Sequence, residues 1–216
     1  FFGDMANFET ARRLAETAKE RFGKIDILVN TVGTFGFSPV WEMSEATWDH
    51  VNIVKPKSHF NTIRHVLPYM MEQKWGRIIN CTSGAFAGAV NHANYSAANA
   101  GVLGLTYSVA KEVWNYGITC NAFSPGAYTR ATFELEAMIM ASPKEKSPLP
   151  PNENFESILE GTPGPEELAP FIAYLASEEA VKISGSVFFV MGNDIVLYSE
   201  AEFKKTLTKS GGRWTF

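Results

Sequence analysis

The chain has 216 residues, of which 45% are hydrophobic and 19% charged, the composition of one soluble globular domain. Its net charge of −4 excludes the basic surface with which proteins bind nucleic acid or anionic membranes, and no apolar run approaches the roughly 18 residues that span a bilayer. By elimination, the function class that remains is small-molecule chemistry. The two cysteines, Cys81 and Cys120, lie inside apolar β-like runs and predict reduced thiols in a cytoplasmic protein.

Helical and strand-like patterns alternate from the first residues onward. Phe1 to Asp4 is typical of the end of a buried strand, and an opening without methionine predicts an N-terminally incomplete chain. Apolar residues at helical spacing then predict a helix over 6–22 that ends at Gly23. The short apolar run 25–30 is typical of a strand that is buried on both faces.

The same alternation recurs three times. Helices predicted over 44–73, 95–116 and 165–177 precede strands predicted over 77–82, 118–122 and 186–190. Four helix–strand cycles with short connections predict one α/β domain over residues 1–216. We expect a Rossmann-like, doubly wound and mainly parallel sheet with helices on both of its faces.

Two segments interrupt this rhythm. Residues 131–164 begin with an apolar helical piece and continue with several prolines, and a long irregular insertion of this kind is typical of a lid over a substrate. The tail from residue 200 to residue 216 is amphipathic and ends in aromatic residues. We expect it to dock on the domain or on a neighbouring subunit.

Ligands of open parallel sheets bind beyond the carboxyl ends of the strands, and a serine and a tyrosine mark this edge. Ser83 follows a predicted strand, and Tyr95 opens a helix 12 residues later in the segment Tyr95–Asn99. This spacing and the segment resemble the short-chain dehydrogenase/reductase family. The resemblance implies NAD- or NADP-dependent interconversion of a ketone and a secondary alcohol, with Tyr95 as general acid or base and Ser83 holding the substrate oxygen.

That chemistry needs a cation beside the tyrosine, because a phenol with a pKa near about 10 is a poor proton carrier at neutral pH. The family normally has Y-x-x-x-K, whereas this chain has Asn99 in place of the lysine. One helix upstream, Lys55 stands where the family's active-site asparagine is expected. The exchange resembles ketoreductase domains of polyketide and fatty acid synthases, and it implies a catalytic set of Ser83, Tyr95, Lys55 and Asn99.

Two interpretations of this exchange stay open. The positive charge has moved from position 99 to position 55 and still serves Tyr95, or the site has lost or changed its function. A lysine on a helix is most often a solvated surface residue, so the first interpretation requires Lys55 to point at Tyr95.

Further positions match the family's cofactor-binding segments. The resemblance implies the following contacts: Asp4 and Met5 with adenine, Asn30 and Gly33 in a turn under the adenosine, and Pro125, Gly126 and Thr129 beside the nicotinamide. The glycine-rich turn that seats the pyrophosphate is expected upstream of Asp4, outside this sequence.

Several alternatives concern partners and activity. The four histidines have no metal-ligand spacing, so no metal is expected, and a surface position is favoured for His92 over one at the pocket mouth. Apolar residues of 131–164 favour a hydrophobic substrate such as an acyl thioester, a steroid or an alicyclic ketone. The family resemblance implies a homotetramer or homodimer built on the helices 44–73 and 95–116. The rival functions are a dehalogenase-like lyase and a catalytically silent subunit.

Overall fold

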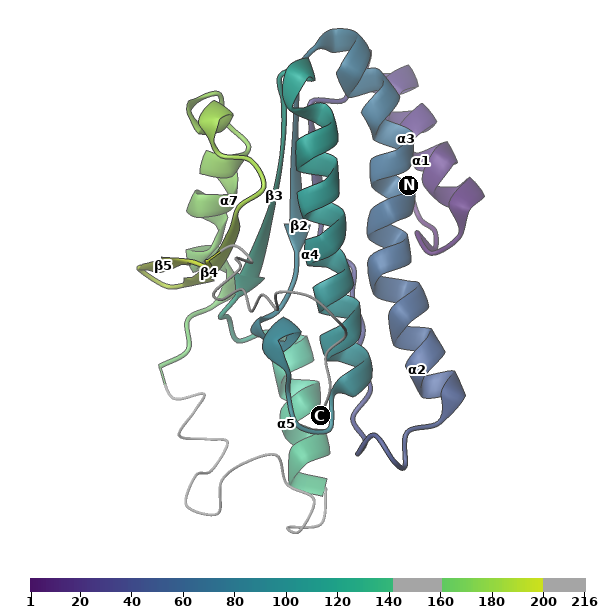
Figure 1. The fold of residues 1–216 in the computed structure, drawn as a ribbon, viewed down its shortest axis with the longest axis vertical. Coiled ribbons are helices and arrows are strands. Elements are labelled where there is room, and N and C mark those ends of the chain that lie inside the picture. The colour runs from purple at the N-terminus through teal and green to yellow at the C-terminus, as the bar shows by residue number, and fades with distance from the viewer. Residues whose placement is uncertain (142–160, 200–216) are drawn as a thin grey trace, which may run out of the picture.

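A five-stranded sheet forms the centre of the described part of the chain, residues 1–141 and 161–199 of a computed structural model (Figure 1). The strands lie in the order β1 (Ile27–Asn30), β2 (Gly76–Cys81), β3 (Ile118–Pro125), β4 (Val187–Met191) and β5 (Asp194–Leu197). The first four are parallel, and β5 pairs with β4 in the antiparallel sense. The predicted mainly parallel α/β sheet is confirmed, whereas β5 was not predicted.

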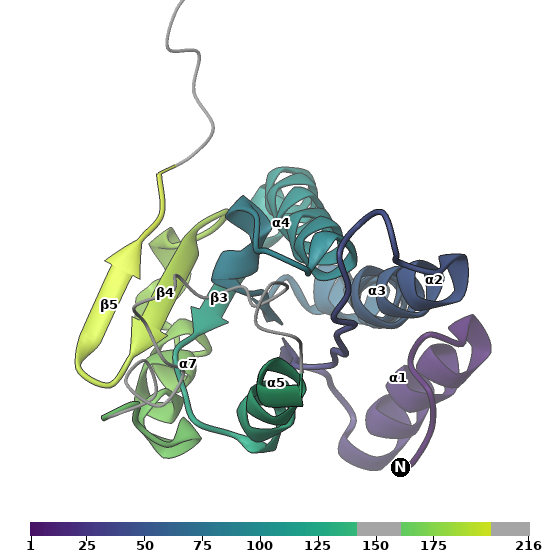
Figure 2. The same cartoon turned by 90° about the horizontal axis from the view of Figure 1, so that it is seen from below.

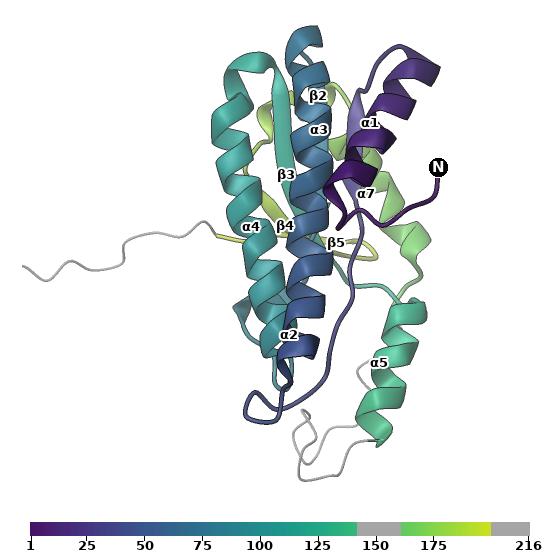
Figure 3. The same cartoon turned by 90° about the vertical axis from the view of Figure 1, so that its right-hand side faces the viewer.

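Helices cover both faces of the sheet (Figures 2 and 3). One face carries α1 (Phe8–Phe22), the continuous run α2 (Glu45–Asn52) and α3 (Ser58–Gln73), and α4 (Ala93–Val113). The other face carries α7 (Ala169–Leu175), and α5 (Arg130–Ala141) lies beyond the carboxyl end of β3. A π-helical turn over Ile53–Lys57 joins α2 to α3, so the predicted single helix over 44–73 contains an irregular turn.

Short 3-10 turns complete these elements. They span Gly84–Ala87, Trp114–Tyr116, Pro165–Glu167 and Glu179–Lys182. The helix predicted over 165–177 is therefore a 3-10 turn followed by the short α7.

Alternating side chains of β2 fill two separate cores. Ile78 packs with Met70 and Val109 on the α3 and α4 side, whereas Ile79 packs with Leu175 on the α7 side. Parallel strands with helices on both faces bury their side chains in this way. The continuous apolar run of β2 thus follows from its central place in the sheet.

The expectation that the strand 25–30 is buried on both faces is wrong for the described residues. Ile27 and Val29 are 46% and 41% exposed, because no described helix covers the α7 side of β1. The predicted strand end at the N-terminus is also absent: residues 1–4 form no strand, and Phe2 is fully exposed.

Some predictions fall outside the described residues. Of the predicted lid over residues 131–164, the structure describes only the part in α5 and residues 161–164. The tail from residue 200 to residue 216 lies outside the described residues. Cys81 and Cys120 are free thiols. Across the two described ranges, the helices are too short or too polar to cross a membrane.

Arg77 ties the amino-terminal edge of the sheet together. It is 1% exposed, its guanidinium lies over the Trp75 ring at 4.4 Å, and it donates hydrogen bonds to three backbone carbonyls. These carbonyls belong to Gly76, Gly117 and Ser177. Because removing the guanidinium leaves one buried and two partly buried hydrogen bonds unmade, we expect Arg77→Met to lower the free energy of unfolding by about 2–4 kcal/mol. Urea unfolding measures this loss, with the exposed Arg64→Met as the control that stays within about 0.5 kcal/mol.

Candidate active site

The carboxyl ends of β1, β2 and β3 meet at one edge of the sheet and bring the candidate residues together (Figure 1). Asn30 ends β1, Cys81 ends β2 two residues before Ser83, and Pro125 ends β3. Tyr95 lies in the first turn of α4, which packs on the same sheet. Segments that are far apart in the sequence therefore converge where an open parallel sheet binds its ligands.

Ser83 and Tyr95 are direct partners. Ser83 is the N-cap of the 3-10 turn Gly84–Ala87, and its Oγ accepts a hydrogen bond from the Ala85 amide at 3.3 Å. Burial raises the pKa of Tyr95, and hydrogen bonding with Ser83 lowers it in part. The phenol is thus a neutral acid at neutral pH, already placed beside the hydroxyl that the family resemblance assigns to the substrate oxygen.

Lys55 lies inside the protein and points at Tyr95. Its side chain is 3% exposed, and Nζ lies 6.0 Å from the centre of the Tyr95 ring. The amine approaches the ring rather than being exposed like Lys57, which is two residues further on. Burial lowers the pKa of Lys55, and the nearby Cys81 thiol raises it.

The π-helical turn explains how Lys55 enters the core. Pro56 has no backbone N–H, so it cannot supply the regular helical hydrogen bond to the preceding turn. A π turn accommodates this by widening one turn of the helix, and such turns are frequent at functional sites. Gly33 provides space for the amine, because a Cβ at this position would stand 3.2 Å from Lys55 Nζ.

Asn99 is fully buried and bound to its own helix. Its Nδ2 donates to the backbone carbonyl of Tyr95 at 2.8 Å, and Thr82 Oγ1 donates to the Asn99 carbonyl at 3.2 Å. Its side chain also lowers the pKa of the Tyr95 phenol, by less than Ser83 does. In this structure Asn99 joins α4 to the end of β2, close to Ser83 and Tyr95.

The predicted cofactor segments lie along the same edge, in different surroundings. Asn30 is buried, donates to Asn80 Oδ1 at 2.9 Å and accepts from Thr62 at 2.8 Å, so it fixes the start of the turn to Gly33. A Cβ at Gly126 would collide with Met191 at 2.7 Å, which explains the glycine there.

Other residues of these segments are held by local hydrogen bonds. The Thr129 hydroxyl pairs with that of Thr132 at 3.3 Å at the start of α5. Asp4 is exposed and accepts from the Ala6 amide at 2.8 Å, and the Met5 carbonyl accepts from Asn61 at 2.8 Å. The N-cap of α1 is Asn7, so Asp4 shapes the turn that precedes that helix.

Aromatic residues that the motif left out surround Tyr95. Phe35 meets the Tyr95 ring edge-on with centroids 6.4 Å apart, and His92 does so at 5.9 Å. Phe37 packs on His92 at 5.1 Å. His92 is only 8% exposed, so the interpretation that favoured a surface position is wrong, and the pocket-mouth alternative fits. His92, three residues before Tyr95, was the available signal in the sequence, whereas Phe35 and Phe37 come from a distant segment.

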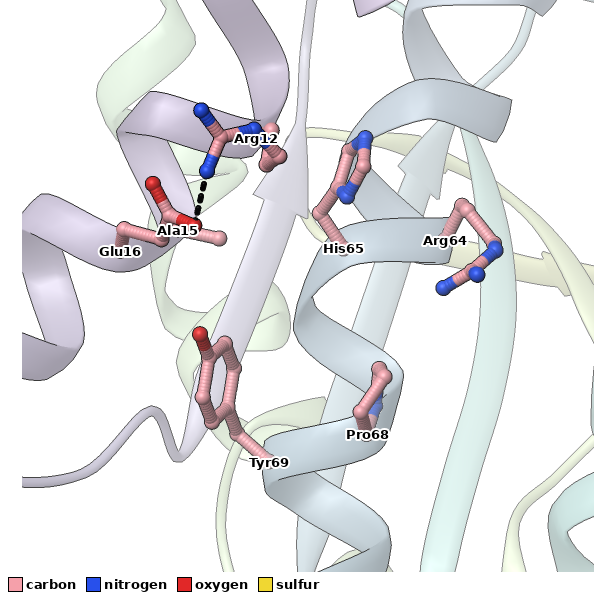
Figure 4. Close-up of a pocket in the computed structure, with 7 residues that line it drawn as sticks. All are labelled: Arg12, Ala15, Glu16, Arg64, His65, Pro68 and Tyr69. Carbon is pink, nitrogen blue, oxygen red and sulfur yellow. Dashed lines mark hydrogen bonds and ion pairs between the residues drawn. The ribbon is translucent and has the colours of Figure 1, made fainter. Parts of the chain in front are cut away.

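A separate groove lies between α1 and α3 (Figure 4). It has a volume of about 270 Å³ and is lined by Arg12, Ala15, Glu16, Arg64, His65, Pro68 and Tyr69. Arg12 is paired with Glu16 there. None of the candidate catalytic residues lines this groove. Within the described ranges, no cluster of three or more histidine, cysteine or acidic residues is arranged to hold a metal ion.

Comparison with known proteins agrees with this geometry. A family model described as short chain dehydrogenase matches residues 1–137. The chain is 36% identical to a 3-oxoacyl-[acyl-carrier-protein] reductase of Staphylococcus epidermidis, over 88% of this chain and 76% of that protein. It is 34% identical to an acetoacetyl-CoA reductase of Allochromatium vinosum, over 89% of this chain and 75% of that protein.

A solved structure has the same fold over nearly the whole chain. A short chain dehydrogenase from Mycobacterium avium matches with a TM-score of 0.79 and 34% sequence identity. The match covers 98% of this chain and 67% of that one. The chain therefore spans about two thirds to three quarters of the length of these three proteins.

Proposed function

The chain belongs to the short-chain dehydrogenase/reductase family of NAD(P)-dependent oxidoreductases, and on this premise we propose that it interconverts a ketone and a secondary alcohol on a hydrophobic substrate. The observation that carries the proposal is the grouping of Ser83, Tyr95 and the buried Lys55 at the carboxyl edge of the sheet. A proton donor, a hydroxyl that can orient a carbonyl, and a cation are the side chains that this reaction needs.

Each side chain has a distinct task. In the reducing direction, the hydride for the carbonyl carbon would come from a bound nicotinamide. Tyr95 gives its phenolic proton to the carbonyl oxygen, and Ser83 holds that oxygen by a hydrogen bond. Lys55 stabilises the tyrosinate that is left, because a cation close to the ring in a buried site interacts strongly with the new negative charge. Oxidation runs the same steps backward, with tyrosinate as the base.

The cofactor, NAD or NADP, would lie along the carboxyl ends of β1 to β3. Asn30 and Gly33 would form the turn under its adenosine side, with Asp4 and Met5 nearby. Pro125, Gly126 and Thr129 would border the nicotinamide. The Thr129 hydroxyl would have to leave Thr132 to bind a carboxamide, and the 3.3 Å contact between them is weak enough to exchange.

The substrate class follows from the surroundings of Tyr95. Phe35 and Phe37, with His92 between Phe37 and Tyr95, offer a partly apolar wall. The names of the two reductases above specify acetoacetyl-CoA and 3-oxoacyl-[acyl-carrier-protein], which are both thioesters, as substrates. We therefore infer that a 3-oxoacyl thioester is the first substrate to test, ahead of steroids and alicyclic ketones.

The family resemblance also favours assembly into a homotetramer or homodimer. α4 lies beside the continuous run of α2 and α3 on one face of the sheet, and Phe60 of α3 is 46% exposed (Figure 3). Sedimentation velocity gives the mass directly, and a monomer at micromolar concentration would contradict this part of the proposal.

Cofactor binding and turnover test the function together. We expect the protein to give a nicotinamide difference spectrum with NADPH or NADH, and to reduce at least one member of a panel of 3-oxoacyl thioesters and cyclic ketones. Tyr95→Phe should keep the cofactor spectrum and lose turnover by about 100-fold or more. Cofactor binding without turnover of any ketone would favour a silent subunit, and turnover without any nicotinamide would favour a lyase.

The pH dependence should differ in sign between the two directions. Because burial raises the pKa of Tyr95, the protonated acid persists through neutral pH, and reduction should fall only as the pH rises through this raised pKa. Oxidation needs the phenolate and should increase over the same range. Ser83→Ala removes a hydrogen bond that lowers this pKa, so it should shift both profiles to higher pH. Profiles of kcat/KM against pH, which report the groups of the free enzyme, measure this shift, and a shift to lower pH would contradict the assignment.

A further inference from the structure

His59 is a buried histidine that contacts Lys55 without belonging to the family motif. It follows Lys55 by four residues, lies in the first turn of α3 and is 0% exposed. Its Nδ1 lies 2.8 Å from the backbone carbonyl oxygen of Lys55. The imidazole thus contacts the irregular turn that carries the buried amine.

The hydrogen bond fixes the tautomer of His59. A carbonyl oxygen only accepts, so Nδ1 carries the hydrogen and donates a hydrogen bond to the backbone carbonyl of Lys55. Burial and the nearby Lys55 lower the pKa of His59 to about 4, which keeps the ring neutral at neutral pH. Nε2 is then an acceptor, and it has no hydrogen-bond donor among the described residues, because the backbone carbonyls at the ends of β1 and β2 can only accept.

The other neighbours of His59 are the ends of two strands. The backbone carbonyls of Asn30 and Cys81, the last residues of β1 and β2, act on the ring and raise its pKa against the effect of burial. His59 therefore fills the space between the π-helical turn and the sheet edge where the candidate catalytic residues gather. A shift of the ring would move the carbonyl of Lys55 relative to these strands.

Burying a histidine in this space lowers the stability of the fold. Leaving a buried polar nitrogen without a partner costs about 1–3 kcal/mol, and an apolar side chain of similar size would avoid that cost. The turn also needs support, because Pro56 removes one backbone hydrogen bond from it. The Lys55 carbonyl accepts hydrogen bonds from the Ser58 amide and from His59 Nδ1.

We propose that His59 is a positioning residue, which holds the π-helical turn through the Lys55 carbonyl and thereby keeps Lys55 Nζ over Tyr95. This role rests on the proposed part of Lys55 in catalysis. The groups around the Lys55 amine are Cys81 at the end of β2, which raises its pKa, the Tyr95 ring on α4, and His59 on α3, whose own pKa is lowered by Lys55. His59 acts through the backbone and touches neither substrate nor cofactor.

Three substitutions at His59 distinguish the contributions of Nδ1, Nε2 and the volume of the ring. His59→Asn keeps a donor near the position of Nδ1, His59→Gln keeps a polar atom near Nε2, and His59→Leu keeps bulk without either. We expect His59→Asn to stay within about threefold of the parent kcat. His59→Gln and His59→Leu should lose about tenfold or more in kcat, because a misplaced catalytic group costs that much, while KM for the cofactor stays within about threefold.

A second readout does not depend on turnover. In protein labelled with ¹³Cε-lysine, the pH titration of the Lys55 signal reports how deeply the amine is buried. We expect this titration to be unchanged in His59→Asn, and to move up toward that of an ordinary lysine in His59→Leu and His59→Gln, as Nζ reaches solvent. Circular dichroism and thermal unfolding show whether each variant is folded.

Three results would overturn the proposal. Parent-like kcat and parent-like Lys55 titration in all three variants would show that His59 positions nothing. Equal loss in His59→Asn and His59→Leu would assign the effect to ring volume, and rescue by Gln rather than Asn would assign it to Nε2. If no ketone is reduced but the Lys55 titration follows the expected pattern, the redox proposal fails and the positioning role of His59 stands.

Discussion

Lys55→Ala is expected to lower kcat by about 100-fold or more, with little loss of folded protein. The amine lies 6.0 Å from the centre of the Tyr95 ring and is 3% exposed, so its charge acts on the phenol with little screening by water. Without it, the tyrosinate that forms during reduction has no cation beside it, and its formation becomes harder. A loss of 100-fold corresponds to about 2.7 kcal/mol of transition-state stabilisation.

Lys57→Ala is the matched control for this prediction. Lys57 stands in the same π-helical turn and is exposed, so its removal changes the same helix without touching the site. We expect the control to keep kcat within about twofold. Initial rates with saturating cofactor and a 3-oxoacyl thioester measure both variants. Activity of Lys55→Ala within a few-fold of the parent would mean that the amine does not serve Tyr95.

The fold was predictable because its pattern is local. Period-3.6 and all-apolar stretches identify α1, α3, α4 and the strands β2 and β3 without knowledge of their partners. At the two edges of the sheet, the burial of β1 and the existence of β5 were not predictable in the same way. The burial of Ile27 and Val29 depends on which helices cover them, and β5 pairs with β4 through a tight turn at Gly192 that the apolar pattern did not separate from β4.

The candidate site divides in a similar manner. The spacing of Ser83 and Tyr95 follows from a strand, a turn and a helix start, so the sequence alone brings them together. The sequence identified Lys55 as the replacement cation, but the inward direction of its side chain depends on Pro56 and the π-helical turn, which the sequence pattern did not predict. Phe35 contacts the site through tertiary packing, which leaves no regular spacing in the chain. His59 and His92 stand four and three residues from Lys55 and Tyr95, but their burial depends on the packing of the helices on the sheet.

The exchange of positions 55 and 99 can be tested in reverse. Asn99→Lys alone places a second amine in a fully buried position beside Tyr95, the ring that Lys55 also faces, and two buried like charges repel. It also removes the hydrogen bond from Asn99 Nδ2 to the Tyr95 carbonyl. We expect this single variant to lose about 3 kcal/mol or more of unfolding free energy, measured by urea unfolding.

Adding Lys55→Asn to Asn99→Lys should recover much of that loss, because the double variant again has one buried amine near Tyr95. We expect a coupling free energy of about 1–3 kcal/mol in the double-mutant cycle, and a kcat about tenfold above that of Lys55→Asn alone. The coupling isolates the repulsion, since each single variant also loses contacts of its own. A double variant that is folded but no more active than Lys55→Asn would show that a cation at position 99 cannot replace one delivered by the π-helical turn.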